Sequence, residues 1–466
     1  MTRSDHSPEP KGALRRLAEA AGSLAVLNLG SMAIAFLIGV LLARQLGPSD
    51  YGIYGLAMTV VTLAGMVTEF GLPTLTMREV AAAKARDNWG AARGLELWAD
   101  RVVLALSALL LIGFFVWAGL TGKAATSAFA ATMVWAILLI PVVALGKLRG
   151  LALLSLGHTI AGQLPVLLIR PGLFALALLA AWAIGKSLSP QLAMAMQAGA
   201  ALAAMLVVRT AWLRLRPEAM RRAAPIYHAR SWMAACIPMG MNEGLRLLQG
   251  QSAILLLGLL ANTRQVGIYR VADAVAAIAG VGMSILATAA TPMFASLHAS
   301  GSRQELQRVA SVTALGMTLS TFLLGLPFLL AGKWIFSFVF GTAFAPSAVP
   351  FLLIWGGMVT FSIFGPAQTL ANMSGHQSIS ATSLVIAVSV NVGVGLVLIP
   401  FFQAAGAAMG VAAANLASGL WLWRRLGKLE GINASVFSAD LLTLAQSHRI
   451  GNFLRLQSGA VRGKDQ

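Results

Sequence analysis

Residues 232–260 read WMAACIPMGMNEGLRLLQGQSAILLLGLL, an apolar stretch with Glu243 and Arg246 near its middle. A helix of this length rises about 44 Å, enough to cross a bilayer, and places both charges about 16–21 Å from its start, too deep for simple snorkelling. Asn242, Arg246 and Gln249 share one face of this helix. Glu243 can pair with Arg246 at the i,i+3 spacing. An ionisable pair inside a membrane helix indicates a transport pathway, and a purely structural ion pair is the alternative.

The composition of the whole chain is that of a membrane protein. Of 466 residues, 58% are hydrophobic and 11% are charged, and the mean hydropathy is +0.78, which excludes a water-soluble domain of this size. The net charge of +18 does not indicate nucleic-acid binding, because 26 of the 34 Lys and Arg residues fall in alternate loops and tails. The single cysteine, Cys236, excludes an internal disulfide, so we expect helix packing alone to hold the fold.

Apolar runs along the chain predict an all-α polytopic membrane protein with twelve transmembrane helices. The first run is longer than the core of a signal peptide and eleven more follow it, so we expect it to be retained. The predicted spans are 17–43, 52–77, 102–121, 125–146, 160–184, 191–212, 232–260, 268–294, 310–331, 347–371, 379–402 and 405–424. The loop bias of Lys and Arg predicts a multi-pass protein with both termini in the cytoplasm.

Two short repeats indicate an internal duplication. Gly52-Ile53-Tyr54 recurs as Gly267-Ile268-Tyr269 at an offset of 215, and Gly157-His158 recurs as Gly375-His376 at an offset of 218. Six spans return each half to the same side of the membrane, so the predicted lobes are parallel, with binding expected between them near the midplane. The predicted parts are a disordered basic cytoplasmic N-terminus (1–16), a first lobe (17–212), a cytoplasmic linker (213–231), a second lobe (232–424) and a basic cytoplasmic tail (425–466).

Several motifs resemble those of one transporter family. They are Leu42-Ala43-Arg44-Gln45-Leu46-Gly47-Pro48, Tyr51-Gly52-Ile53-Tyr54, Glu69-Phe70-Gly71-Leu72 and Arg78-Glu79, and in the second half Leu256-Leu257-Gly258 and the basic loop after Pro292. Over about residues 15–425 the chain resembles the Wzx-type polysaccharide and O-antigen flippases of the multidrug/oligosaccharidyl-lipid/polysaccharide (MOP) superfamily. The resemblance implies two six-helix bundles in a MATE-like V. It also implies alternating-access transfer of a polyprenyl-pyrophosphate-linked oligosaccharide to the outer leaflet, for O-antigen, capsule or exopolysaccharide synthesis.

An unshielded pyrophosphate group cannot cross the hydrocarbon core of a membrane, so we expect the protein to provide a hydrated cleft lined by cationic side chains. Arg246 is the first candidate for its charge, because the guanidinium fork suits phosphate oxygens. Arg170 is the second: Pro165 and Pro171 flank it, and broken backbone hydrogen bonds there can open the helix. The structural alternatives are pairing with Glu243 for Arg246 and carbonyl contacts at the kink for Arg170. The predicted substrate-binding residues are Arg246, Arg170, Asn242, Gln249 and Arg44, for the last of which a helix-capping role is the alternative.

Acidic side chains within the spans are candidates for ion coupling. Glu243 can exchange a proton or a cation as Arg246 changes partner. Asp273 and Glu69 are the further candidates. For Asp273 the alternative is a surface pair with Arg270, and for Glu69 it is a polar residue at the cytoplasmic rim.

The sequence contains no motif for catalysis, nucleotide binding or metal binding. We therefore expect a transporter without a cofactor, whose partners are the lipid-linked oligosaccharide and the bilayer and not nucleic acid. Glycosyltransferases and the polymerase of the same pathway are further candidate partners. Two alternatives stay open: a cation-coupled multidrug exporter of the same superfamily, and a membrane polysaccharide polymerase or ligase. Arg170 and Arg246 favour an anionic substrate over cationic drugs, and the short predicted outer loops disfavour a polymerase.

Overall fold

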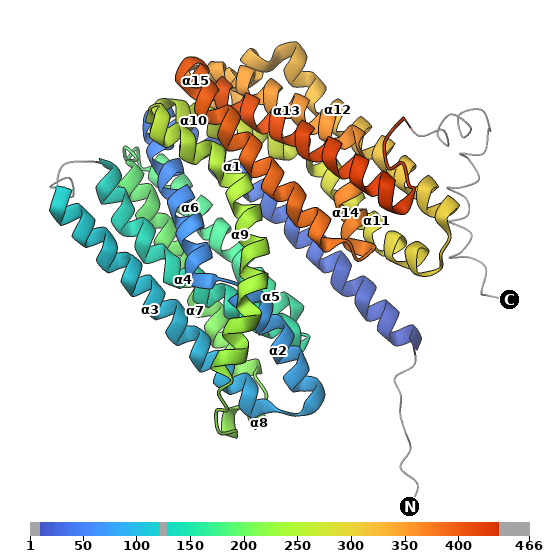
Figure 1. The fold of residues 1–466 in the computed structure, drawn as a ribbon. Helices are drawn as coiled ribbons and strands as arrows, with labels where there is room; N and C mark the ends of the chain where they lie inside the picture. Colours follow the sequence, from blue (N-terminus) through green and yellow to red (C-terminus); the bar gives the residue numbers. More distant parts are fainter. Residues whose placement is uncertain (1–9, 122–127, 438–466) are drawn as a thin grey trace, which may run out of the picture. The chain divides into compact units, whose positions relative to one another are not determined.

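The computed structural model describes residues 10–121 and 128–437, and this part of the chain is almost entirely helical with no strand (Figure 1). Nine of its helices are long and apolar enough to cross a membrane. The predicted all-α polytopic membrane fold is therefore confirmed. Residues 1–9 of the predicted N-terminal segment and 438–466 of the predicted tail lie outside the described residues.

The helices follow one another along the chain with short connections. In order they are α1 (Pro10–Glu69), α2 (Leu72–Arg86), α3 (Trp89–Thr121), α4 (Ala128–Leu156), α5 (Thr159–Leu164), the π-helix η1 (Pro165–Ile169), α6 (Arg170–Ala183), α7 (Pro190–Leu215), α8 (Glu218–Arg222), α9 (Ala229–Leu260), α10 (Thr263–Ala279), α11 (Val281–Ala299), α12 (Arg303–Phe340), the 3₁₀-helix η2 (Thr342–Ser347), α13 (Ala348–Ile363), α14 (Ala367–Met373) and α15 (Gln377–Glu430).

Helix α15 holds two predicted spans, and α1 holds the first predicted span and most of the second, 52–77, which continues into α2. In α1 the backbone leaves the helical region at Gly47 (φ 69°), directly before Pro48, as the Leu46-Gly47-Pro48 sequence predicts. In α15 the break falls at Gln403 (φ 51°), between the predicted spans 379–402 and 405–424. The predicted spans lie mostly on helices, but 52–77, 268–294 and 347–371 each cross a break between two helices, and residues 125–127 lie outside the described part of the chain. Helix α9 is not among the nine helices that are long and apolar enough to cross a membrane, because charged and amide side chains interrupt its apolar residues.

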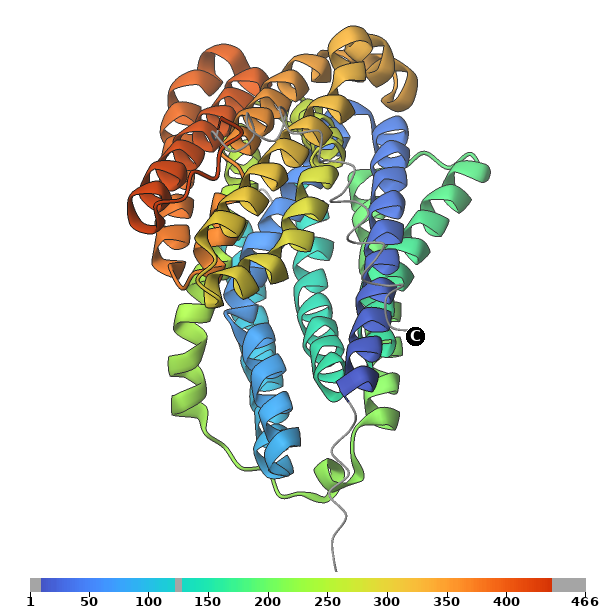
Figure 2. The same cartoon turned by 90° about the vertical axis from the view of Figure 1, so that its right-hand side faces the viewer.

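Several helices extend into segments predicted as loops. Residues 78–101, a predicted loop, belong mostly to α2 and α3, and α4 continues through most of 147–159. Charged residues in these segments pair with one another, which lets the helix continue beyond the apolar run that defined the predicted end. The predicted linker contains the short helix α8, which lies in the green loop between α7 and α9 (Figure 2).

The chain forms two compact units. Unit 1 consists of the residues up to Gly258 together with Asn262–Arg270 and Val339–Phe344, and unit 2 of Leu259–Ala261, Val271–Phe338 and the residues from Ala345 onward. In unit 1, α4 packs against α1, α2 and α7. Helix α9, part of the predicted second lobe, belongs almost wholly to unit 1. The lobe boundaries drawn from the sequence stay a prediction.

Glycines set the packing of α9 against the second half of α1. A Cβ atom on Gly240 would meet the ring of Phe70, and one on Gly258 would meet the side chain of Leu56. The two helices therefore run in opposite directions with their backbones close together. Small residues permit such close approach between membrane helices, whose association gains little from the hydrophobic effect.

The duplicated Gly-Ile-Tyr motifs contact each other within unit 1. A Cβ atom on Gly52 would overlap the carbonyl oxygen of Thr263 and would lie 3.1 Å from the backbone nitrogen of Gly267. A Cβ atom on Gly267 would overlap the carbonyl oxygen of Pro48 and would lie 3.2 Å from the backbone nitrogen of Gly52. The contact is reciprocal, and it requires glycine at both positions.

Unit 2 has its own core. Helices α13 and α14 pack on α15, α11 packs on α14, and residues 431–437, here called the C-terminal strap, return into the unit. Ile432, Ala434 and Ser435 of the strap are buried, and the Val436 N–H donates to the Ile363 carbonyl at 3.0 Å. The strap thus fixes the end of α15 to the rest of unit 2.

Candidate binding site

The polar face of α9 is open. The Glu243 and Arg246 side chains are exposed and Gln249 is half-buried, while glycines of the same helix face α1. Within the described part of the chain, Glu243 and Arg246 form no ion pair with each other or with another residue. The structural pair considered from the sequence is therefore not formed, and the Arg246 side chain is exposed. The side chain of Asn242 lies outside the described residues.

A cavity of about 250 Å³ lies inside unit 1 and contains two of the predicted site residues, Glu69 and Arg170. Lys147 is the third charged residue in its wall. The remaining wall is almost wholly apolar and comes from α4, η1 and α7: Val142, Val143, Gly146, Val166, Ala201, Ala204, Met205 and Val208. The cavity thus concentrates three charges in apolar surroundings, where electrostatic interactions are stronger than in water.

Glu69 is held by an ion pair. Its Oε2 atom lies 2.7 Å from Nζ of Lys147, and the Glu69 side chain is only 15% exposed against 41% for Lys147. Glu69 ends α1 and Lys147 lies in the second half of α4, so the pair links two helices of unit 1. From the sequence, a polar residue at the cytoplasmic rim was the alternative for Glu69. The structure adds that Glu69 lines the cavity.

Arg170 follows an irregular turn of its helix. The Arg170 N–H donates to the Pro165 carbonyl, an i→i−5 bond that closes the π-helical turn η1. The opening expected from Pro165 and Pro171 is therefore present as a π turn, a feature found frequently at functional sites. Arg170 is half-buried and makes no hydrogen bond through its side chain and no ion pair with a described residue.

Arg44 and Asp273 are not part of the wall of this cavity. Arg44 Nε donates to the Val339 carbonyl at 2.8 Å. Asp273 is half-buried on α10, in the part of that helix that belongs to unit 2. Arg270, one turn earlier, donates to the Gly55 carbonyl and lies over the rings of Tyr51 and Tyr54 at 5.8 and 5.9 Å.

Sequence reasoning missed Lys147 as a site residue. The loop pattern of positive charge assigns it to a cytoplasmic loop, whereas it belongs to α4 and faces the cavity. Its partner Glu69 is 78 positions away. No periodicity in a single sequence connects residues at such a distance, so only the fold could reveal this pair.

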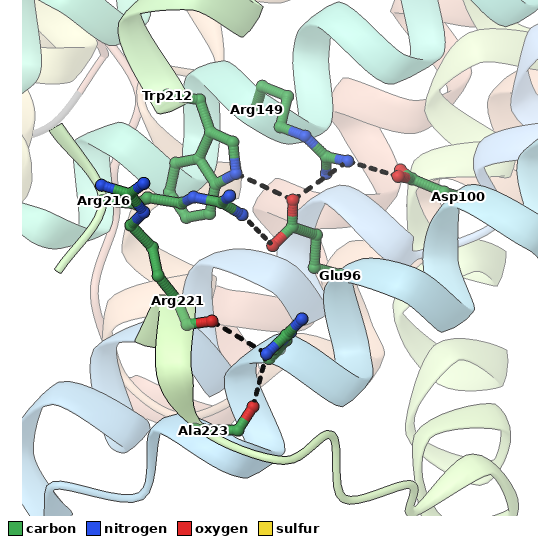
Figure 3. A network of polar contacts seen from close by, with 8 residues as sticks. Glu96, Asp100, Arg149, Trp212, Arg216, Arg221 and Ala223 are labelled. Atoms are coloured by element: carbon green, nitrogen blue, oxygen red, sulfur yellow. Dashed lines mark hydrogen bonds and ion pairs between the residues drawn. The ribbon is translucent and has the colours of Figure 1, made fainter. Parts of the chain in front are cut away.

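A second buried network, also missed, ties α3 to α4 and α7 (Figure 3). Glu96 accepts a hydrogen bond from Trp212 Nε1 at 2.8 Å and lies 3.4 Å from Arg149 and 3.8 Å from Arg216. Arg149 also bonds Asp100. These charges neutralise one another, so the network links three helices of unit 1 and offers no free charge to a substrate. The i,i+4 spacing of Glu96 and Asp100 was the one available sequence signal.

In unit 2 a carboxylate joins two histidines. Glu430, at the end of α15, lies 3.2 Å from His376 Nδ1 and 4.0 Å from His298 Nδ1. His376 directly precedes α15, and the sequence did not predict its acidic partner. Among the described residues, no group of three His, Cys, Asp or Glu side chains could hold a metal ion.

The fold is similar to those of solved MOP-superfamily transporters. The inward-facing structure of a MATE family multidrug resistance transporter is 14% identical, with a TM-score of 0.68 over 86% of this chain and 96% of that one. The lipid II flippase MurJ in an inward closed conformation is 10% identical, with a TM-score of 0.66 over 86% and 87%. A mutant of the Vibrio cholerae MATE transporter VcmN is 15% identical, with a TM-score of 0.58 over 90% and 99%.

A comparison of the sequence with curated proteins finds no match. The family model described as polysaccharide biosynthesis protein matches residues 17–298, more than half of the chain, and agrees with the resemblance carried by the first-half motifs. With the polytopic helical fold and the shared architecture of the MOP transporters, this match shows that the chain belongs to the polysaccharide biosynthesis protein family.

Proposed function

We propose that the protein is a flippase that carries a polyprenyl-pyrophosphate-linked oligosaccharide from the cytoplasmic to the outer leaflet, for the synthesis of a cell-surface polysaccharide. Membership of the polysaccharide biosynthesis family supports the sugar class. The main structural support is Arg246: an accessible guanidinium near the middle of a helix of membrane-spanning length, with no ion-pair partner among the described residues.

The chemistry of such a substrate explains why its transporter needs an arginine without an ion-pair partner. The polyprenyl tail remains in lipid, while the pyrophosphate needs a cation and hydrogen-bond donors to leave water. Arg246 supplies both in one planar fork, and Gln249 on the same helix face supplies an amide. Asn242 and Arg44 are the further proposed contacts, and the route is alternating access between the two lobes.

Glu243 lies beside Arg246 and provides a simple means of coupling. Glu243 can exchange a proton or a cation as Arg246 binds and releases the pyrophosphate, so that the coupling ion moves in the direction opposite to the substrate. Asp273 remains a further proposed coupling residue, and the proposed location is the bacterial inner membrane with both termini in the cytoplasm.

A drug exporter of the same superfamily would have the same fold, so only the charge of the substrate distinguishes it from the proposed flippase. A drug exporter needs acidic and aromatic side chains around a cationic drug. The polar face of α9 instead presents Arg246 next to Glu243, and the cavity of unit 1 contains two cations against one carboxylate. This charge balance favours an anionic substrate.

A transport assay in vesicles tests the proposal. The purified protein is reconstituted with a polyprenyl-pyrophosphate oligosaccharide, and the fraction of sugar accessible to an external, impermeant lectin is followed with time. We expect transfer by the wild type and at least tenfold slower transfer by Arg246→Ala, since a charge-assisted contact contributes about 1.5–3 kcal/mol. Equal rates for vesicles with and without wild-type protein would contradict the proposal.

A further inference from the structure

The cavity of unit 1 has an unbalanced positive charge. Lys147 and Glu69 form an ion pair at 2.7 Å, and Glu69 also attracts Arg170 in the same wall, so one carboxylate faces two cations. Arg170 makes no ion pair within the described chain, although eight of the eleven lining residues are apolar or glycine. A charge in apolar surroundings costs free energy unless a counter-charge or water meets it. The cavity therefore has one charge that its own side chains do not match.

The same charge balance determines whether the cavity favours a positively or a negatively charged ligand. A metal cation or a cationic drug would approach two positive groups, and the one carboxylate present is already paired. An anion would instead meet the guanidinium fork of Arg170 and, at the cost of its pair with Glu69, the ammonium group of Lys147. The charges thus favour an anion.

The size of the cavity limits that anion. Sites for drug-sized ligands have volumes of about 300–1,000 Å³, and this cavity has about 250 Å³, so an oligosaccharide does not fit inside it. A chloride, a phosphate or a pyrophosphate group is small enough. The π turn before Arg170 also adds a backbone irregularity at the cavity wall, and such turns frequently mark functional sites.

We infer that this cavity is a binding site for a small anion, with Arg170 and Lys147 as the donors and Glu69 as an internal counter-ion that competes with the ligand. The anion is either a free inorganic ion or the pyrophosphate group of the transported lipid. The second source rests on the proposed function, and the first does not.

Anion binding to the full-length protein tests the inference. Calorimetry in detergent measures the binding of sodium pyrophosphate, phosphate and chloride at constant ionic strength. For the anion that binds the wild type, we expect Arg170→Gln to weaken binding at least tenfold and Arg170→Lys to weaken it less, because the charge stays. Glu69→Gln should tighten binding, because Lys147 loses its internal competitor. Arg230→Gln, an exposed arginine at the start of α9, should bind as the wild type does.

Several outcomes would overturn the inference. They are no saturable binding of any of the three anions, an unchanged affinity in both Arg170→Gln and Lys147→Gln, or weaker binding in Glu69→Gln. If Arg170→Gln fails to fold, the anion affinities of Arg170→Lys and Lys147→Gln test the inference instead. Loss of pyrophosphate binding in Arg246→Gln but not in the cavity variants would place the anion on α9 and also contradict the inference.

Competition separates the two sources of the anion. If polyprenyl pyrophosphate displaces the bound anion from the wild type, the cavity receives the head group of the lipid. If it does not, the site serves a free inorganic anion. A flippase that fails to bind anions in the cavity would still transport in the vesicle assay, so failure of this inference and failure of the proposed function give different results.

Discussion

Arg270 donates from Nη1 to the backbone carbonyl oxygen of Gly55 at 3.0 Å, across 215 positions of sequence. This separation equals the offset between the two Gly-Ile-Tyr motifs, so the bond joins equivalent positions of the proposed repeats. Gly52 and Gly267, a second equivalent pair, lie in reciprocal contact one turn away. The repeated motifs therefore contact each other within unit 1, at positions that are equivalent in the predicted repeat.

The close contact at Gly52 predicts a large effect of one methyl group. Gly52→Ala should lower the free energy of unfolding by about 1–3 kcal/mol, because its Cβ would overlap the Thr263 carbonyl, which cannot move away as a side chain end could. The thermal unfolding midpoint of the detergent-solubilised protein measures the loss. Gly65→Ala on the same helix is the matched control, since its Cβ would meet nothing within 4 Å.

The buried network of polar contacts around Glu96 predicts that the loss of a buried arginine lowers the stability of the protein more than the loss of an exposed one. Arg149→Met should destabilise the protein by about 3 kcal/mol, since it leaves Glu96 and Asp100 without their shared partner. Arg222→Met removes the exposed ion pair with Glu218 and should cost less than about 1 kcal/mol. Thermal unfolding of the two variants side by side tests this, and equal losses would show that the network contributes no special stability.

The C-terminal strap predicts a stabilising role for Asn433. Its carbonyl accepts from Gln307, its N–H donates to the Gln307 side chain, and its Oδ1 accepts from Trp423 Nε1 at 2.8 Å and from Ser435. Asn433→Ala should therefore lower the unfolding midpoint, by about 1–3 kcal/mol in free energy. Asn415→Ala on α15 is the comparison. A midpoint equal to that of the wild type would mean that the strap is not bound in solution.

The open guanidinium of Arg246 predicts a graded response to substitution. Arg246→Lys keeps the charge but loses the fork, so polysaccharide export should fall partly, whereas Arg246→Ala should abolish it. Cells that carry each variant are compared for surface polysaccharide and for the amount of transporter in the membrane. Arg230→Ala should export normally. Normal export by Arg246→Ala at normal abundance would exclude Arg246 as a substrate contact.

Much of the fold could be predicted because membrane helices follow simple rules. Apolar runs located the helices, and Gly47-Pro48 located the break in α1. The helix ends were less predictable, because charged segments such as 78–101 continue as helix once their side chains find partners. Local sequence contains no information about such partners.

The candidate site was predicted residue by residue but not as an arrangement. Arg170 and Glu69 were both singled out, for different roles, and the structure places them in one cavity with Lys147. The spacing of Arg246 and Glu243 allows them to pair, yet within the described chain they do not. An i,i+3 spacing permits a pair without requiring it, since exposed ion pairs gain little free energy.

The most direct test of the central claim is the position of the lipid-linked sugar in cells that lack the protein. Polyprenyl-pyrophosphate oligosaccharides are extracted after labelling of the outer face of the inner membrane with an impermeant reagent that reacts with the sugar. We predict that complete repeat units accumulate unlabelled on the cytoplasmic face, and that the wild-type gene, but not Arg246→Ala, restores their labelling. Complete units that reach the outer face without the protein would contradict the assignment as a flippase.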